Sequence, residues 1–279
     1  MELFDNHAHY NDDKFNDDRD EIINKIYESG VTKLICAGYS VESSKKALEI
    51  ANNYDFIYTT AGISPNDIPG KVQDEDLDAK TDEEVHKLFT ESMQIVDNQL
   101  HEIEQIAQNN KVVAIGEIGL DYYWNKRNKE LQKQVFIKQI ELANKLNLPI
   151  VIHTRDAVMD TLDILKNIKP TIKPGVFHCC PLNIELVKEA LKLGFYISFA
   201  GPVTFKNSKN ASEIIQMVPL DKMLIETDSP YLAPEPIRGT RNDSRNVKFV
   251  AAKIAEFKGI SVEEVAKNTY GNAEKVFGI

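Results

Sequence analysis

The sequence predicts an α/β fold: a (β/α)8 TIM-type barrel with an extra C-terminal helix, formed by residues 1–279 as a single domain. Short β-branched or aromatic runs recur eight times, and amphipathic stretches with apolar residues three and four positions apart lie between them. Most of the short runs are apolar throughout, as expected for parallel strands covered on both faces. An open doubly wound sheet is the alternative, but no glycine-rich phosphate loop follows the first run.

Each predicted strand is a short apolar run at the expected spacing. The eight strand candidates are 1–9, 32–38, 56–63, 111–120, 149–154, 175–179, 195–201 and 222–228. Helical patterns between them include 19–30, 40–54 and 130–147, with Ser40 as a plausible N-cap and Gly30 and Gly194 as plausible ends. Two more helical patterns, 244–259 and 261–277, follow the last strand, and Ser261 and Glu264 have the capping-box spacing.

One connection, residues 64–111, is longer than the others and contains the acidic run QDEDLDAKTDEE. We predict a solvated loop leading into the start of a long helix that ends near residue 110, because acidic residues favour helix N-termini. A lid over a functional site is the alternative interpretation.

Composition limits the classes of protein that the chain can belong to. No apolar run approaches 18 residues and the N-terminus is acidic, so we expect neither a membrane span nor a secretion signal. Three cysteines, Cys36, Cys179 and Cys180, are too few for a disulfide framework and predict a reducing, cytoplasmic location. A net charge of −10 argues against a surface that binds nucleic acid everywhere, although a local basic patch or bound cations could still do so.

The stretch FDNHAHYND near the N-terminus concentrates polar side chains in a predicted strand. Alternate residues of a strand share a face, so Asp5, His7 and His9 are expected to point together. The stretch is either a set of metal ligands or a polar N-terminal loop. Asp5 could orient one of the histidines or make a structural hydrogen bond at the strand end.

Four more ionisable residues lie late in predicted strands or at their ends: Glu117, His153, His178 and Asp228. The carboxyl ends of barrel strands meet at one rim, where such enzymes have their active sites, so these residues should converge with His7. Imidazole and carboxylate ligands suit one or two divalent cations such as Zn, Mg, Mn, Ni or Co. Glu117, on a central strand, is the candidate bridge between two cations.

Several motifs follow one another in order along the chain: D-x-H-x-H at the start, GEIGLDYYW, VIHTRDA, VFHC, GFYISFAGPVTFKNS and MLIETDSPYLAPEPIRGTRN. Together they resemble the TatD family of metal-dependent deoxyribonucleases, which belong to the amidohydrolase-type barrels. The resemblance implies a (β/α)8 barrel, one or two divalent cations and hydrolysis of DNA phosphodiester bonds. The family's metal positions fall here on His7, His9, Glu117, His153, His178 and Asp228. Ser64 stands where the family often has a histidine, and Cys180-Pro181 also departs from its pattern.

The hypothesis that follows is hydrolysis by a metal-activated water. One cation would be held by His7, His9, Glu117 and Asp228, and a second by Glu117, His153 and His178. Glu117 and Asp228 are the catalytic candidates, and Asp228 could also accept the proton of the water.

Substrate contacts are expected on the rim loops. The candidates for binding phosphate are Arg155, Lys206, Arg238 and Arg241, although a solvated surface residue is the alternative interpretation of each. The aromatic residues of DYYW, 121–124, could stack on unpaired bases or simply pack. The expected partner is DNA with single-stranded or frayed ends, cleaved as an exonuclease would, with no membrane and no obligate protein partner.

Two other functions remain open. A small-molecule amidohydrolase, lactonase or phosphotriesterase could use the same site, but many such barrels bridge their metals with a lysine, whereas the fourth strand here offers Glu117. A metal-binding or scaffold protein without turnover is the other alternative.

Overall fold

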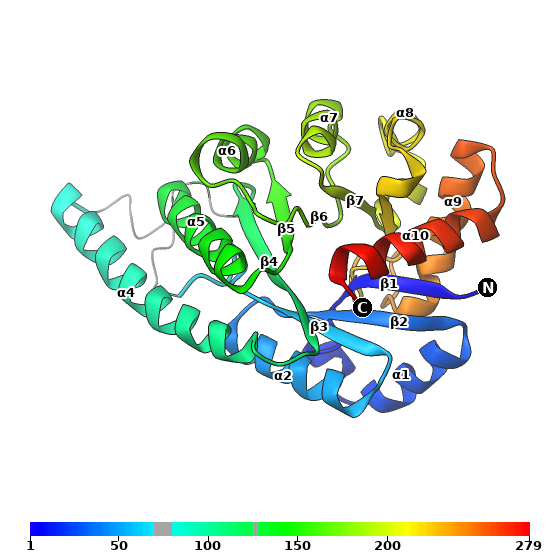
Figure 1. The fold of residues 1–279 in the computed structure, drawn as a ribbon, viewed down its shortest axis with the longest axis horizontal. Coiled ribbons are helices and arrows are strands. Elements are labelled where there is room, and N and C mark those ends of the chain that lie inside the picture. The colour runs from blue at the N-terminus through cyan, green and yellow to red at the C-terminus, as the bar shows by residue number, and fades with distance from the viewer. Residues whose placement is uncertain (70–79, 125, 127) are drawn as a thin grey trace.

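The computed structural model describes residues 1–69, 80–124, 126 and 128–279. Eight parallel strands follow one another in chain order from β1 to β8, which confirms the predicted barrel (Figure 1). The strands are β1 Leu3–Ala8, β2 Val31–Ala37, β3 Ile57–Ala61, β4 Val112–Asp121, β5 Ile150–Arg155, β6 Val176–Phe177, β7 Tyr196–Phe199 and β8 Met223–Ile225.

The barrel closes where the first and last strands meet at their carboxyl ends. A parallel bridge joins Ala8 to Ser229, and the backbone N–H of His9 donates to the Ser229 carbonyl at 2.6 Å. The N–H of Asp228 donates to the His7 carbonyl at 2.9 Å. Closure therefore brings the histidine-containing end of β1 against the segment that carries Asp228.

Helices surround the strands on the outside (Figure 1). They are α1 Arg19–Glu28, α2 Val41–Asn53, α4 Asp82–Ile106, α5 Lys129–Leu146, α6 Val158–Asp163, α7 Ile184–Lys192, α8 Ala211–Met217, α9 Val247–Lys258 and α10 Val262–Phe277. A π-helical turn, Ile164–Ile168, extends α6, and single 3-10 turns occupy Asp13–Phe15, Gly201–Thr204, Leu220–Lys222 and Ser244–Asn246. The predicted caps are present, since Ser40 accepts from Ser43 N and Ser261 from Glu264 N.

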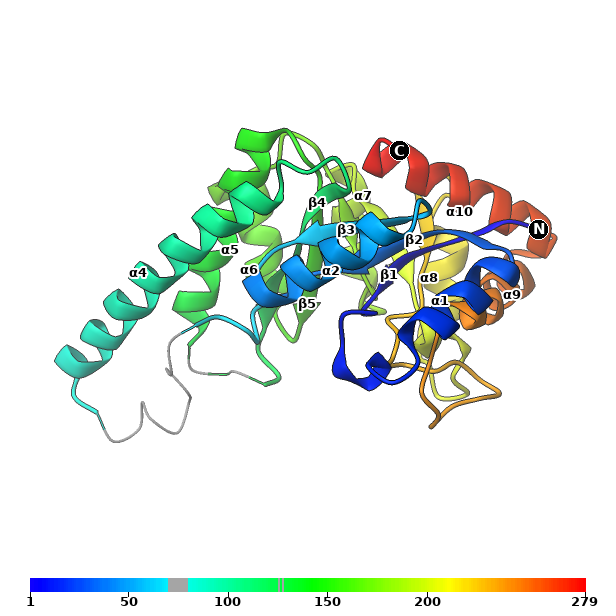
Figure 2. The same ribbon diagram turned by 90° about the horizontal axis from the view of Figure 1, so that it is seen from below.

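The extra C-terminal helix α10 is confirmed, and it completes the core at the amino end of the barrel. Phe4, Val151 and Leu224 from three strands form one buried cluster with Phe277 of α10. Figure 2 shows α10 on the opposite side of the strands from the loop that follows β8. Because apolar side chains fill this end of the barrel, the polar side chains of β1 and β4 are left for the other end.

The long third connection contains α4, a helix of 25 residues. Its first turn is acidic, as the sequence predicted, and a complete capping box joins Thr81 and Glu84. Residues 73–79 of the acidic run lie outside the described residues. Among the described helices, none is long and apolar enough to cross a membrane.

Candidate metal centre

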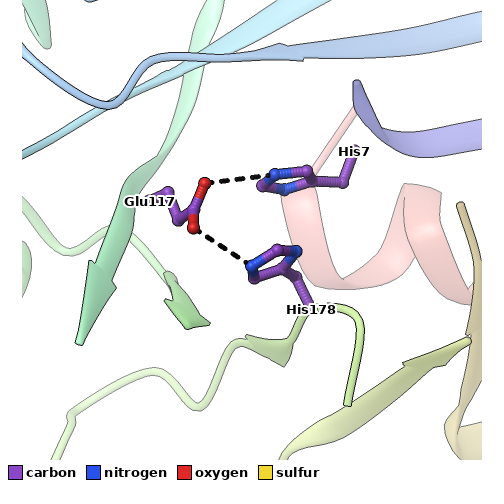
Figure 3. Close-up of side chains that lie close together, drawn as sticks. All are labelled: His7, Glu117 and His178. Atoms are coloured by element: carbon purple, nitrogen blue, oxygen red, sulfur yellow. Dashed lines mark ion pairs between the residues drawn. The ribbon is translucent and has the colours of Figure 1, made fainter. Parts of the chain in front are cut away.

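Six side chains from five strand ends converge at the carboxyl end of the barrel, and they are the six predicted metal ligands. The carboxylate of Glu117, on β4, faces the edges of the imidazole rings of His7 and His178, with one oxygen toward each ring (Figure 3). These two rings are themselves stacked, with centroids 4.0 Å apart. The other three members are His9, His153 and Asp228.

The two oxygens of Glu117 face two different sets of nitrogen atoms. Oε2 lies 3.4 Å from Nε2 of His7 and 3.7 Å from Nε2 of His9. Oε1 lies 3.0 Å from Nδ1 of His153 and 3.2 Å from Nε2 of His178. This arrangement is the one expected of a carboxylate that bridges two cations.

Asp228 completes the first set. Its Oδ1 lies 3.2 Å from Nε2 of His9 and 3.8 Å from Nε2 of His7. The residue lies three positions beyond β8 and has a left-handed backbone, with φ of 56°. Aspartate adopts this conformation more readily than most residues, and here it turns the carboxylate toward the histidines of β1.

Glycine allows β4 to approach β5 closely beside Glu117. At Gly119, φ is +139°, and a Cβ atom would lie 1.9 Å from the carbonyl oxygen of His153. The pairing of the two strands is irregular between Ile115 and Ile118, which is the position of Glu117. A regular strand would direct its side chains by strict alternation, so this irregularity helps to set the direction of the Glu117 carboxylate.

Asp5 does not join the histidines, and the prediction that Asp5, His7 and His9 share one face is wrong. The pairing of β1 with β2 is irregular between Asp5 and Ala8, so strict alternation is lost in the middle of the motif. Both carboxylate oxygens of Asp5 accept from Thr227, from its N–H at 2.9 Å and its hydroxyl at 2.5 Å. Asp5 therefore takes the second of the two roles considered for it, a structural hydrogen bond at the strand end.

Two carboxylates that were not predicted from the sequence contact the imidazoles of His153 and His178 on the side away from Glu117. Asp121 Oδ2 lies 2.9 Å from Nε2 of His153, and Glu226 Oε1 lies 3.3 Å from Nδ1 of His178. In both histidines the other ring nitrogen faces Glu117. A carboxylate on the far nitrogen fixes the orientation and tautomer of a metal-binding histidine. Both residues could have been found, because each carboxylate lies at the end of an apolar run.

The site holds its carboxylates ionised. Burial acts to raise the pKa of Glu117, but the nearby imidazoles of His178, His153 and His7 outweigh it and lower the pKa well below the usual value. For Asp228, too, burial acts to raise the pKa, and the hydrogen bond with His9 lowers it overall. Burial acts to lower the pKa of His178, yet the Glu117 and Glu226 carboxylates raise it well above the usual value.

This donor set fits a divalent cation. The Nε2 atoms of His7 and His9 lie 3.2 Å apart and both face carboxylate oxygens. Carboxylate oxygens and unprotonated imidazole nitrogens are acceptors, so such crowding requires a proton or a cation between them. Two groups have ligand atoms within 4.8 Å of one another: His7, Glu117 and His178, and His7, His9 and Asp228. Imidazole and carboxylate together are typical ligands of Zn, Mn, Ni and Co.

A cavity of about 840 Å3 opens over the centre. Five of the six side chains line it, and His7 lies buried behind them. One wall is apolar and is formed by Pro181, Leu182, Pro202, Val203 and Leu232. The opposite part of the lining is polar and aromatic and includes Ser64, Asp67, Asp121, Trp124 and Arg155.

The predicted phosphate-binding residues are not all placed together. Arg155 lines the cavity. Lys206, Arg238 and Arg241 are exposed and are not among the residues that line it. Arg238 lies over the ring of Phe205, and Arg241 forms an ion pair with Asp18. Among the four candidates, Arg155 is therefore the one that the fold places at the candidate metal centre.

Comparison with known proteins agrees with this geometry. The family model described as TatD related DNase matches residues 4–278. The uncharacterized metal-dependent hydrolase YabD of Bacillus subtilis (strain 168) is 39% identical over 277 residues, which cover 99% of both chains. The uncharacterized metal-dependent hydrolase YcfH of Escherichia coli (strain K12) is 45% identical over 180 residues, 64% of this chain and 68% of the relative.

Solved structures agree on the fold. YjjV, a TatD homologue from Escherichia coli K12, superposes with a TM-score of 0.83 at 24% identity, over 99% of this chain and 98% of that one. The organophosphorus hydrolase of Deinococcus radiodurans superposes with a TM-score of 0.64 at 13% identity, over 99% of this chain and 92% of that one.

The barrel and its cluster of imidazoles and carboxylates define the class, a metal-dependent hydrolase. Within that class, the chain belongs to the TatD family.

Proposed function

We propose that this protein is a divalent-metal-dependent deoxyribonuclease that hydrolyses the phosphodiester bonds of DNA from single-stranded or frayed ends. One observation carries the proposal: each oxygen of Glu117 faces its own set of imidazoles. A pair of cations bridged in this way suits in-line displacement at phosphorus. The family match to TatD related DNase supports DNA as the substrate.

The proposed roles of the side chains follow from their contacts. One cation would be held by His7, His9 and Asp228, and a second by His153 and His178. Glu117 would bind both cations. When bound, such cations lower the pKa of a water and offset charge on the phosphoryl oxygens. Asp228 is the proposed acceptor for the proton of the attacking water, because its lowered pKa keeps it ionised at neutral pH.

The cavity also has a cationic side chain that suits a substrate with a phosphate group. Arg155 is more than a third exposed on the cavity wall and could donate to a phosphate through the edge of its guanidinium.

We also propose a reducing, cytoplasmic location. The three cysteines Cys36, Cys179 and Cys180 are all free, which supports it.

A small-molecule phosphotriesterase or lactonase is the second candidate. It is considered because the fold is shared with the organophosphorus hydrolase and with a structure from the engineering of organophosphate hydrolysis activity from a weak promiscuous lactonase template. Both likenesses are below 25% identity and concern the fold alone.

A panel of substrates tests the proposal. Protein loaded in turn with Mg²⁺, Mn²⁺, Zn²⁺, Ni²⁺ and Co²⁺ is incubated with DNA labelled at its 5′ or 3′ end, with a lactone and with a phosphotriester. We expect stepwise shortening of single-stranded DNA from one end. The variant Asp228→Ala should lose this activity while Glu213→Ala, an exposed change on α8, retains it. Absence of DNA cleavage with every cation would overturn the proposal, and rapid hydrolysis of the triester or lactone alone would favour the second candidate.

A further inference from the structure

We propose that Tyr123, Trp124 and Arg155 form a stacking site for one unpaired nucleobase at the mouth of the cavity. We call these three residues the rim cluster. The nucleobase assignment rests on the proposed function, because the stacking surface itself selects only a flat, π-faced group. None of the three residues is a proposed metal ligand.

The rim cluster is a compact cation–aromatic assembly. The guanidinium carbon of Arg155 lies 3.8 Å from the centroid of the Tyr123 ring and 5.7 Å from that of Trp124. The two aromatic rings are perpendicular, with an interplanar angle of 89° and centroids 4.8 Å apart. The Arg155 guanidinium is therefore in cation–π contact with the Tyr123 ring.

Two of the three members of the cluster, Trp124 and Arg155, face the cavity. Trp124 is 64% exposed and Tyr123 is 46% exposed, although large aromatic side chains usually bury most of their surface. Trp124 and Arg155 both line the cavity that contains Glu117 and Asp228. An exposed aromatic surface beside a cavity that has both apolar and polar lining is typical of a ligand-binding site.

Hydrogen bonds tie the rim cluster to the candidate metal centre. Asp121 Oδ1 accepts from the backbone N–H of Tyr123 at 2.9 Å and of Trp124 at 3.1 Å. The other oxygen of Asp121 contacts His153. Arg155 lies on the same strand as His153, two residues further along, and pairs in register with Asp121. A group stacked on the rim cluster is thus held at a set position relative to Glu117.

An unpaired base matches this surface better than a paired one. Bases stack on aromatic rings and on guanidinium planes with little regard to sequence, because each base has a π-face. The end of a duplex exposes only the outer face of its last pair, and the duplex is wider than a single base. The edge of Arg155 remains able to contact the phosphate of the same nucleotide. The rim cluster would therefore favour single-stranded or frayed ends.

The chain contains one tryptophan, so the fluorescence of Trp124 reports on the rim cluster alone. Full-length protein loaded with Mg²⁺ is titrated with a short single-stranded oligonucleotide whose phosphorothioate linkages resist cleavage. Parallel titrations use the same strand with abasic residues at its last three positions at each end, and the blunt duplex. We expect the intact single strand to quench the emission and to bind about 10-fold more tightly than the abasic strand.

Two variants separate stacking from charge. Arg155→Lys retains the positive charge but loses the planar face, so binding of the intact strand should weaken about 5- to 10-fold, and binding of the abasic strand, which keeps only the phosphate contact, should weaken less. Tyr123→Ala should weaken the intact strand in the same selective way. The control, Tyr27→Ala, removes an aromatic ring that is 53% exposed on α1 and does not line the cavity, and it should leave both affinities unchanged.

Equal affinity for the intact and abasic strands in the wild type would overturn the stacking site, as would equal weakening of both by Arg155→Lys. DNA cleavage measured in parallel with hydrolysable strands separates this failure from failure of the proposed function. Cleavage without base-dependent binding would refute the rim cluster alone, whereas base-dependent quenching without cleavage under any cation would refute the nuclease proposal alone.

Discussion

Asp121 contacts both the candidate metal centre and the rim of the cavity. Burial acts to raise its pKa, but hydrogen bonds with His153 and Asn66 outweigh this effect and lower the pKa to about 2. Asp121 is therefore a carboxylate at neutral pH and can hold the Nε2–H of His153, which leaves Nδ1 free to bind a cation.

The variant Asp121→Asn should lower the affinity for divalent cations about 10- to 100-fold, because an amide orients the imidazole less strongly than a carboxylate does. Competition with a chromophoric chelator measures this affinity. The matched control is Asp160→Asn, whose carboxylate binds Tyr122 and Lys133 outside the cavity. Equal affinities in wild type and Asp121→Asn would contradict the role given to Asp121.

Cation binding at this centre should release protons. The raised pKa of His178 means that its imidazole is protonated at pH 7 in the metal-free protein, and a cation can bind only the neutral ring. The apparent affinity for cations should therefore rise with pH up to the pKa of this histidine. Calorimetric titration with Mn²⁺ at pH 7, in two buffers of different ionisation enthalpy, measures the protons released. A net release of zero would show that His178 is already neutral or takes no part.

The six ligand positions could be predicted because each is a polar residue late in an apolar run or just beyond it. The contacts between individual atoms of the site could not be predicted, because the partners lie far apart in the sequence. His178 and Glu226, for example, are 48 residues apart. The same limit applies to Arg241, whose partner Asp18 lies 223 residues away. Its ion pair with that residue could not be inferred from the basic loop alone.

At the scale of the strand, β4 depends on a glycine. The variant Gly119→Ala should lower the free energy of unfolding by about 2–4 kcal/mol, because its Cβ would collide with the His153 backbone and φ is +139°. The contrasting control is Gly271→Ala in α10, where nothing lies within 4 Å of the added Cβ, and alanine should stabilise the helix by about 0.5–1 kcal/mol. Urea unfolding measures both. Equal effects of the two substitutions would contradict the close approach of β4 and β5.

The periodicity of the chain was sufficient to predict all eight strands and the extra helix α10. The same periodicity gave a wrong prediction within β1, where strict alternation of side chains assigned Asp5 and His7 to one face of the strand. An irregular pairing of this kind arises from the contact between neighbouring strands, so the pattern of one strand does not reveal it.

For the molecule as a whole, a net charge of −10 disfavours long-range attraction to DNA. Association should depend on bound cations and on a small number of local contacts, of which Arg155 is one. We therefore expect a shallow salt dependence for single-stranded DNA, with a slope of log K against log salt of about −0.7 to −1.4, the value for one or two neutralised phosphates. Fluorescence titration at several salt concentrations measures it. A slope of about −4 or steeper would reveal an extended basic surface that this account does not include.

The bridging role of Glu117 in DNA hydrolysis is the central claim. It is tested most directly by the rate at which wild type and Glu117→Gln cleave end-labelled single-stranded DNA while Mn²⁺ is added stepwise to metal-free protein. We predict that wild-type activity is absent with chelator and rises until about two equivalents are bound, and that Glu117→Gln, with an unchanged circular dichroism spectrum, is slower by a factor on the order of 1,000. Full activity in Glu117→Gln, or cleavage by the wild type that persists in chelator, would contradict the account.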